Sequence, residues 1–428
     1  MWLGIVSNKK ALSVFEAFSL SFGGQAPLTS IITFGTVGLQ LGGSFLVPAT
    51  IIGTILVLVN GLVIYSLSIR YPQQGGYFTY AFYSLTERLG LLSGWMFTLY
   101  AFAYGGTLLA GSIYILSTYV KYPFLSEDIF TIIIILVSAF FIVRGLDLSV
   151  KYAEFISLAE ITAIIVASLI LLIKANSSFS LTIPVNPFLV ILYAIGMPIG
   201  YENLNPMSGE VKNARRVVGI ITVAVILAGG LLSALLFYGS SLYGNSDLLQ
   251  LIRDSSPFIF IYLIFSALNG GVLGGIAYII AMSRAMFSMS QNNFMPSFLA
   301  KSRDNRPFNA EVSSLIIYSI LLIISIHFFG TYSTFLFLGG LTVLSYLLIS
   351  VSASFSLVRI SIKKIRKRKK EITLGVLASI MSLVVLIYAI QENIPAINYI
   401  FFSWIIIGFL YAEILEILGK YKEPEEEH

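Results

Sequence analysis

Apolar segments of about 20 residues follow one another along most of the chain, and short polar stretches separate them. A helix of this length crosses the roughly 30 Å hydrocarbon core of a bilayer. The pattern therefore predicts an all-α membrane protein with about 12 transmembrane helices. The expected spans are 12–38, 45–69, 90–119, 128–144, 152–174, 187–211, 217–242, 257–290, 310–330, 333–358, 373–391 and 396–418.

Two of these segments contain residues that disfavour the interior of a helix. The first segment carries Gly23–Pro27, and the sixth carries Gly196–Glu202. Gly and Pro are poor helix formers, and unwound backbone survives at membrane depth only where it is buried in protein or lines a cavity. A pair of interrupted spans, one in each half of a membrane chain, indicates the substrate site of a transporter.

The basic residues indicate how the chain is oriented in the membrane. If the N-terminus lies inside, the outer loops contain only Lys121, Lys174 and Arg253, and the other 23 of the 26 Lys and Arg lie on the inner side or at inner helix ends. The basic run 363–370 is the strongest marker of that side. We therefore predict a multi-pass protein of the cell membrane with cytoplasmic N- and C-termini.

This topology predicts an internal repeat. With both ends inside, spans one to five and spans six to ten run in opposite directions, and the interrupted spans are the first of each set. That is the pattern of an inverted repeat of five plus five helices. We expect one transporter domain over 1–428, with the repeats at about 12–174 and 187–358 and two peripheral helices at about 373–418.

Free peptide groups at the two breaks predict the charge of the substrate. The half-helix after the first break presents unpaired N–H groups, which suit a carboxylate, and freed carbonyls at the second break suit an ammonium group. A zwitterionic amino acid matches both ends. Glu202 either binds a cationic group of the substrate or accepts hydrogen bonds from the broken helix, and the sequence leaves both alternatives open.

Glu160 is the charged residue that most needs explanation. It lies nine residues beyond Lys151 on the fifth span, about 13 Å into the membrane. A carboxylate there costs several kcal/mol unless it is paired, hydrated or protonated. It is a candidate for the coupling-ion site, and the alternative is a structural hydrogen bond or salt bridge between helices. Ser266 and Asn269 on the eighth span are candidates for the same site.

Composition excludes several other classes of protein. The chain is 57% hydrophobic and 11% charged, which no soluble domain matches, and it contains no cysteine and only two histidines. We therefore expect no disulfide, thiol catalysis or metal centre. The net charge of +5 follows topology rather than a nucleic-acid surface. No phosphate-binding loop or catalytic triad is present, so neither an enzyme nor an ATP-driven pump is expected, and no cofactor.

Three groups of short motifs occur in a characteristic order. They are Tyr71-Pro72 with Gly75-Gly76 and Gly94-Trp95; Gly200-Tyr201-Glu202 with 209–216; and 283–287 with Met295-Pro296 and 306–310. Together they resemble the amino acid–polyamine–organocation (APC) transporter superfamily over residues 12–358. The resemblance implies a leucine-transporter-like fold with helices 1 and 6 broken, and alternating access to a substrate held between helices 1, 3, 6, 8 and 10.

The resemblance also assigns roles by position. The substrate carboxylate would meet Gly23, Gly24 and Gln25, and its amine would meet the carbonyls near Gly196 and Ile199. Some members carry a proton-coupling lysine at the place of Glu160, so that mechanism does not transfer to this chain. Members that have an aromatic gate carry it where Gly196 stands here, so the gate lies elsewhere or is absent. From its own position near the inner end of the eighth span, apart from the resemblance, Arg284 is expected to pair with an acidic residue at a cytoplasmic gate.

We therefore predict a secondary transporter that imports amino acids, with proton symport as the favoured mechanism. Exchange of amino acids or polyamines is the alternative, and a channel or a non-transporting receptor is a more distant one. The predicted partners are an amino acid, a proton and the lipid bilayer. The predicted substrate contacts are Gly23, Gly24, Gln25, Ala26, Tyr104, Gly196, Ile199, Gly200, Tyr201 and Glu202, and the predicted coupling residues are Glu160, Ser266 and Asn269.

Overall fold

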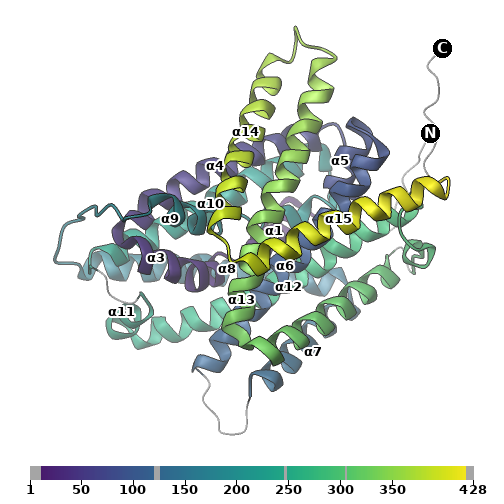
Figure 1. Ribbon diagram of the computed structural model, residues 1–428. Coiled ribbons are helices and arrows are strands. Elements are labelled where there is room, and N and C mark those ends of the chain that lie inside the picture. Colours follow the sequence, from purple (N-terminus) through teal and green to yellow (C-terminus); the bar gives the residue numbers. More distant parts are fainter. Residues whose placement is uncertain (1–10, 120–125, 245–247, 304–305, 421–428) are drawn as a thin grey trace.

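The computed structural model describes residues 11–119, 126–244, 248–303 and 306–420, and the regular structure of these residues is helical (Figure 1). Helices occur at all of the predicted spans, which confirms the all-α membrane fold. Lys121 and both chain ends lie outside the described residues. The long helices are α1 (Val14–Gln25), α4 (Leu46–Ser68), α6 (Glu87–Tyr119), α7 (Glu127–Arg144), α8 (Leu146–Lys174), α9 (Pro187–Ile195), α10 (Ala214–Ser241), α12 (Pro257–Gln291), α13 (Phe308–Ile362), α14 (Lys369–Glu392) and α15 (Pro395–Ile417).

Two largely helical stretches are too long to be single spans. Val14–Ser68 and Phe308–Ile362 each contain 55 residues, and a straight helix of that length would measure roughly 80 Å, more than twice the thickness of a bilayer core. Each therefore contains two spans. In α13 the division lies at Gly330, whose φ of 76° and ψ of 165° leave the helical region. The predicted boundary between spans 310–330 and 333–358 is confirmed at this kink.

The turn at Gly330 is held by a side chain from a neighbouring helix. Glu127, in the first turn of α7, accepts hydrogen bonds from the Thr331 backbone N–H and from the Thr331 hydroxyl, each at 2.8 Å. The kink would otherwise leave that N–H unpaired, and a carboxylate at a new helix start is favourable. The contact therefore fixes where the second half of α13 begins.

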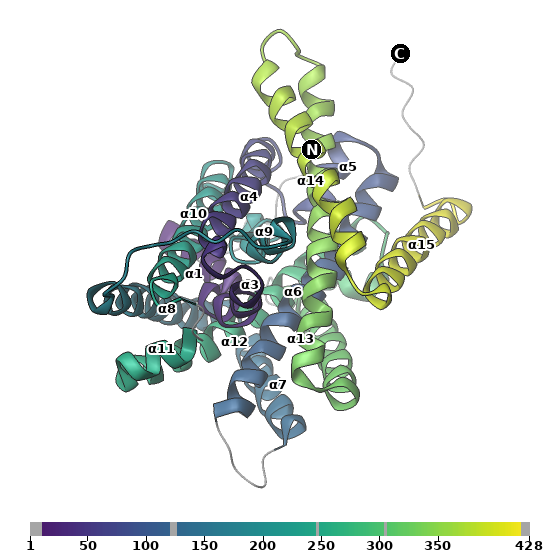
Figure 2. The same ribbon diagram turned by 60° about the vertical axis from the view of Figure 1, so that its left-hand side comes forward.

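The helices are buried to very different degrees. In α6 the most apolar 18-residue window is 83% buried, whereas in α15 the corresponding window is 22% buried. Helix α6 packs against both α12 and α13, while α14 and α15 lie on the outside of the bundle (Figures 1 and 2). The last two helices are therefore peripheral, as their position after the two repeats predicts.

The two ends of the bundle differ in charge. The turn between α13 and α14 carries the exposed run 363–367, and Arg70 at the end of α4 pairs with Glu371 nearby at 2.6 Å. We call this the basic end. The kink at Gly330 and the α14–α15 turn lie at the opposite end, because each helix between them and the basic end crosses the bundle once.

Candidate functional site

The first break lies at one residue. Ala26 adopts a left-handed conformation, with φ of 43° and ψ of 62°, between α1 and the short helix α2 (Pro27–Ser30). Pro27 has no N–H to continue the ladder of α1, and it restricts the residue before it. A π-helical turn, η1 (Ile31–Gly35), and helix α3 (Thr36–Gly42) then complete the span.

The predicted interruption within Gly23–Pro27 is confirmed, and it is confined to Ala26. Gly23, Gly24 and Gln25 belong to the last turn of α1. A Cβ atom at Gly23 would lie 2.9 Å from Leu273 Cγ, and one at Gly24 would lie 2.7 Å from Asn203 Cγ. These glycines therefore serve close packing of α1 against α12 and against the second break.

The second break is longer. Helix α9 ends at Ile195, and a short 3-10 turn, η3 (Tyr201–Leu204), begins after Gly200, which has a φ of 110°. Gly196–Pro198 form a turn, and Ile199 and Gly200 have no regular structure. The prediction that this span is interrupted near Gly196–Glu202 is confirmed.

The two breaks lie side by side in the interior. The Tyr104 hydroxyl of α6 is 2.9 Å from the Gln25 carbonyl oxygen and 3.0 Å from that of Ile199, so its single O–H is shared between the two breaks. The Gln25 side-chain amide donates to the Pro198 carbonyl at 2.8 Å, and the Asn203 amide donates to the Leu20 carbonyl at 2.9 Å. All of these side chains are buried. The broken helices therefore form one polar centre.

Glu202 organises the second break. Its Oε2 accepts hydrogen bonds from the Tyr100 hydroxyl at 2.6 Å, from the Gly200 backbone N–H at 2.8 Å and from the Tyr278 hydroxyl at 3.2 Å. The other oxygen, Oε1, is buried and has no hydrogen-bond partner among the residues that the structure describes. One oxygen therefore stabilises the broken helix, while the second remains available to a ligand. Tyr278 was missed at the sequence level, because nothing in the eighth span distinguishes it.

Glu160 lies deep in α8 and is fully buried. The backbone amides of Leu28 and Thr29 at the start of α2 face its carboxylate, but neither carboxylate oxygen makes a hydrogen bond of normal geometry to a described residue. A Cβ atom at Gly270 of α12 would lie 2.6 Å from the Glu160 carboxyl carbon. The absence of a side chain at Gly270 thus leaves the room that the carboxylate occupies.

The two other predicted coupling residues differ in their surroundings. The Ser266 hydroxyl is buried and unpartnered within the described part of the chain. Asn269 instead accepts a hydrogen bond from the Tyr152 hydroxyl at 2.9 Å and donates to the Phe265 carbonyl at 2.8 Å. Of the two, Ser266 has a free polar group deep in the protein, and Asn269 is engaged with α8.

A cavity of about 920 Å³ lies at the end opposite the basic end. It is lined by α9, the second half of α13 and the start of α15, together with Phe34 of η1. Gly196 at the second break and Gly339 of α13 also line it. The cavity therefore reaches from this end of the bundle to the edge of the polar centre.

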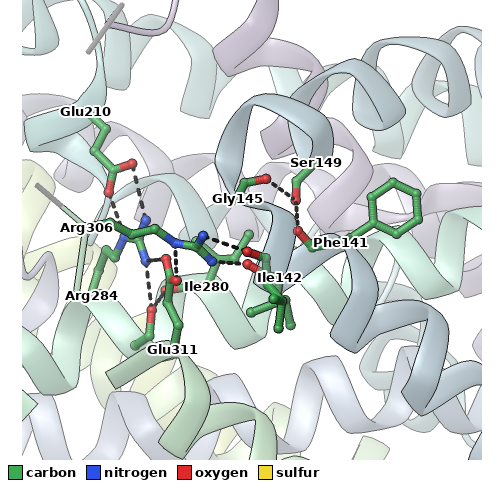
Figure 3. Close-up of polar contacts among 11 residues, drawn as sticks. Phe141, Ile142, Gly145, Ser149, Glu210, Ile280, Arg284, Arg306 and Glu311 are labelled. Atoms are coloured by element: carbon green, nitrogen blue, oxygen red, sulfur yellow. Dashed lines mark hydrogen bonds and ion pairs between the residues drawn. The ribbon is translucent and has the colours of Figure 1, made fainter. Parts of the chain in front are cut away.

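Four charged residues close the basic end, and we call them the charge cluster (Figure 3). Arg284 of α12 donates to Glu210 at 2.6 Å and to Glu311 of α13 at 2.5 Å, which confirms that it pairs with acidic residues. Arg306 also pairs with Glu311 and donates to the Val143 carbonyl at the end of α7 at 3.0 Å. Arg284 and Glu311 are only 2% and 3% exposed, so no water-filled path separates them.

The segment before α1 is joined to the same region. The Leu12 backbone N–H donates to the Glu210 carbonyl at 2.9 Å, and the Lys212 N–H donates to the Leu12 carbonyl at 3.0 Å. This short parallel bridge ties the entry to α1 to the segment that precedes α10. The structure is therefore closed at the basic end and hollowed at the opposite end.

The first and sixth helices are broken and meet in the interior, which defines a leucine-transporter-like fold. The sequence supports the same class. A family model described as "Amino acid permease" matches residues 12–411, and the chain belongs to this family of the APC superfamily. It is therefore a multi-pass membrane transporter.

Curated relatives are distant but cover most of the chain. The low-affinity putrescine importer PlaP of Escherichia coli strain K12 is 23% identical over 82% of this chain and 82% of its own. The methylthioribose transporter of Bacillus subtilis strain 168 is 24% identical over 97% and 96%. A crystal structure of a manganese transporter from Eremococcus coleocola, in complex with an aromatic bis-isothiourea compound, has a TM-score of 0.59 and 14% identity over 96% and 97% of the chains, which shows the shared fold.

Gly200→Ala is expected to disrupt the polar centre. The added Cβ atom would lie 2.6 Å from Gln25 Cα, and the positive φ itself costs about 1–2 kcal/mol for an L-residue. The variant should unfold at a lower temperature than Gly244→Ala, which has the same kind of strain at φ 73° but no atom within 4 Å of its new methyl group. Thermal unfolding of the purified proteins measures the difference. Equal unfolding temperatures would contradict close contact between the breaks.

Proposed function

We propose that this transporter imports amino acids by alternating access and that protons drive the import. It resides in the cell membrane with both termini in the cytoplasm, so the charge cluster closes the cytoplasmic side and the cavity opens outward. The observation that carries the proposal is the meeting of the two breaks at Tyr104 and Glu202.

The polar centre suits an ammonium group. The Gln25 and Ile199 carbonyl oxygens converge on Tyr104, and the unpartnered Glu202 Oε1 lies on the same break. Oxygen acceptors with one carboxylate, in a buried site, favour a cation that can donate several hydrogen bonds. We therefore assign substrate binding to the residues around the breaks: Gly23, Gly24, Gln25, Ala26, Tyr104, Gly196, Ile199, Gly200, Tyr201 and Glu202.

Coupling is assigned to Glu160 of α8 and to Ser266 and Asn269 of α12, the helix whose Gly270 faces Glu160. A buried carboxylate without a cationic partner is tolerated when it is protonated. Its position against the amides of Leu28 and Thr29 links its charge to the geometry of the first break. Binding and release of a proton there would bias the orientation of α1 and α2, which is what a proton-coupled transporter needs.

A polyamine is the second candidate substrate, and one contact favours it. The amides that begin α2 are the groups predicted to receive the carboxylate of an amino acid, yet they already face the carboxylate of Glu160. A diamine has no carboxylate and needs no such donors. The relative PlaP is a putrescine importer, which is consistent with this candidate.

Uptake into proteoliposomes tests both candidates. The purified protein is first screened by thermal shift against amino acids, putrescine and methylthioribose, since a ligand that binds the folded state raises its stability. Labelled hits are then offered with an imposed pH gradient, with and without the same compound inside. Proton symport predicts gradient-driven uptake into empty vesicles, and exchange predicts uptake only into preloaded vesicles.

Two outcomes would overturn the proposal. Ion currents far above the turnover of a carrier would indicate a channel, and ligand binding without uptake under either condition would indicate a receptor. Uptake of putrescine but of no amino acid would replace the first candidate substrate by the second.

A further inference from the structure

Phe34 occupies a position that nothing in the sequence distinguished. It lies in the π-helical turn η1, it is 4% exposed, and its ring lines the inner edge of the 920 Å³ cavity. The resemblance to APC transporters placed an aromatic gate at Gly196, where this chain has no side chain. The question is therefore what separates the cavity from the polar centre.

The ring of Phe34 is held between two glycines. A Cβ atom at Gly196 would lie 3.2 Å from Phe34 Cγ and Cδ2, and one at Gly339 of α13 would lie 3.0 Å from Phe34 Cζ. Its face is covered by Phe335, with ring centroids 5.1 Å apart. The ring thus fills the space that side chains at Gly196 and Gly339 would otherwise take.

The backbone that carries Phe34 is suited to movement. A π-helical turn holds one residue more than an α-helical turn, and such turns are frequent at functional sites. The Thr33 hydroxyl donates to the Thr29 carbonyl at 2.6 Å, and the Thr36 hydroxyl donates to the Ile32 carbonyl at 2.8 Å. Side-chain hydroxyls therefore provide hydrogen bonds to backbone carbonyls around the wide turn. Return of the turn to α geometry would rotate the residues around Phe34 relative to α9.

We propose that Phe34 is the outer gate of this transporter: its ring, seated between Gly196 and Gly339 and covered by Phe335, separates the cavity from the polar centre and must move before a solute passes. Met197 and Ile199 follow Gly196 along the second break, are fully buried, and do not belong to the lining of the cavity. A Cβ atom at Gly35, the neighbour of Phe34, would lie 3.4 Å from Met197 Cε, so Met197 lies close to the gate on the side that does not line the cavity.

Thiol accessibility tests the gate without knowledge of the substrate. Because the chain has no cysteine, Met197→Cys supplies a single thiol close to Phe34 but outside the lining of the cavity, and Ser333→Cys supplies one in the exposed lining of the cavity. Each is placed in three backgrounds: Phe34, Phe34→Ala and Phe337→Ala. Phe337 lines the same cavity but is not seated between glycines, so it is the matched Phe-to-Ala control. A cationic methanethiosulfonate reagent is added to purified protein in detergent, so orientation in a membrane does not affect the result.

Labelling of Met197→Cys should be slow with Phe34 present and at least about tenfold faster with Phe34→Ala, equivalent to about 1.4 kcal/mol in the free energy of opening. Phe337→Ala should leave it slow, and Ser333→Cys should react at one rate in all backgrounds. Phe34→Leu, which keeps apolar volume, should be intermediate if Phe34→Ala is poorly folded.

Three results would overturn the assignment of the gate. They are fast labelling of Met197→Cys with Phe34 intact, equal acceleration by Phe337→Ala, and a parallel change at Ser333→Cys. Since no transported compound enters the experiment, its failure would leave the proposed function untouched, and failure of the uptake assay would leave the gate untouched.

Discussion

Glu160→Gln is expected to reduce uptake driven by a pH gradient to background while binding of the substrate persists. An amide of the same shape keeps the packing against Gly270 but binds no proton, so transport loses its driving ion while the binding site at the breaks remains. Uptake into proteoliposomes, compared with the ligand-induced rise in unfolding temperature, separates the two effects.

Glu154→Gln is the matched control. It lies six residues earlier on α8, is half-buried, and undergoes the same chemical change nearer the end of the helix. It should transport normally. Substrate-dependent proton movement that continues unchanged in Glu160→Gln would remove Glu160 from coupling and leave it a structural role between α8, α2 and α12.

Arg284→Gln is expected to destabilise the protein by roughly 3 kcal/mol, near the lower limit for breaking a buried ion pair, because Arg306 still contacts Glu311. The substitution destabilises the closed state of the basic end, because Arg284 also forms an ion pair with Glu210 there. A thiol introduced by Ser208→Cys, which is buried beside Glu210, should therefore react faster in this variant.

Two control variants test whether the effect of Arg284→Gln comes from its ion pairs. Lys301→Gln removes an exposed positive charge near the same end and should change neither the unfolding temperature nor the labelling rate. Arg284→Lys keeps the charge but cannot engage two carboxylates as a planar guanidinium does, so it should be intermediate. An Arg284→Gln protein as stable as Lys301→Gln would show that the charge cluster does not hold the end closed.

The spans and the interruptions could be predicted from the sequence because local chemistry determines them. Continuous apolar length requires a spanning helix, and Pro27 and the turn before Glu202 disrupt the ladder whatever surrounds them. The extent of the first break could not be predicted. Glycines at 23 and 24 look the same in the sequence whether they unwind the helix or remain helical and let Leu273 and Asn203 pack closely against it.

The details of the site depend on contacts between distant segments. Tyr278 is hydrogen-bonded to Glu202 although 76 positions separate them, and Phe34 is held between Gly196 of the second break and Gly339 of α13. Residue spacing along the chain does not predict such contacts between distant segments. Arg284 was expected to find an acidic partner because a buried guanidinium needs one, but its engagement of both Glu210 and Glu311 follows only from the packed structure.

Arg306 gives the charge cluster a second consequence. Besides Glu311, it holds carbonyl oxygens of Ile142 and Val143 at the last turn of α7. Helix α7 lies in the part of the chain predicted to form the first repeat, whereas α12 and most of α13 lie in the part predicted to form the second. If α7 separates from α12 and α13 at this end, the contacts of Arg306 and Arg284 are all broken together. A partly open state would therefore keep few stabilising contacts. The passage at the basic end should therefore open cooperatively, between one closed and one open state, rather than by degrees.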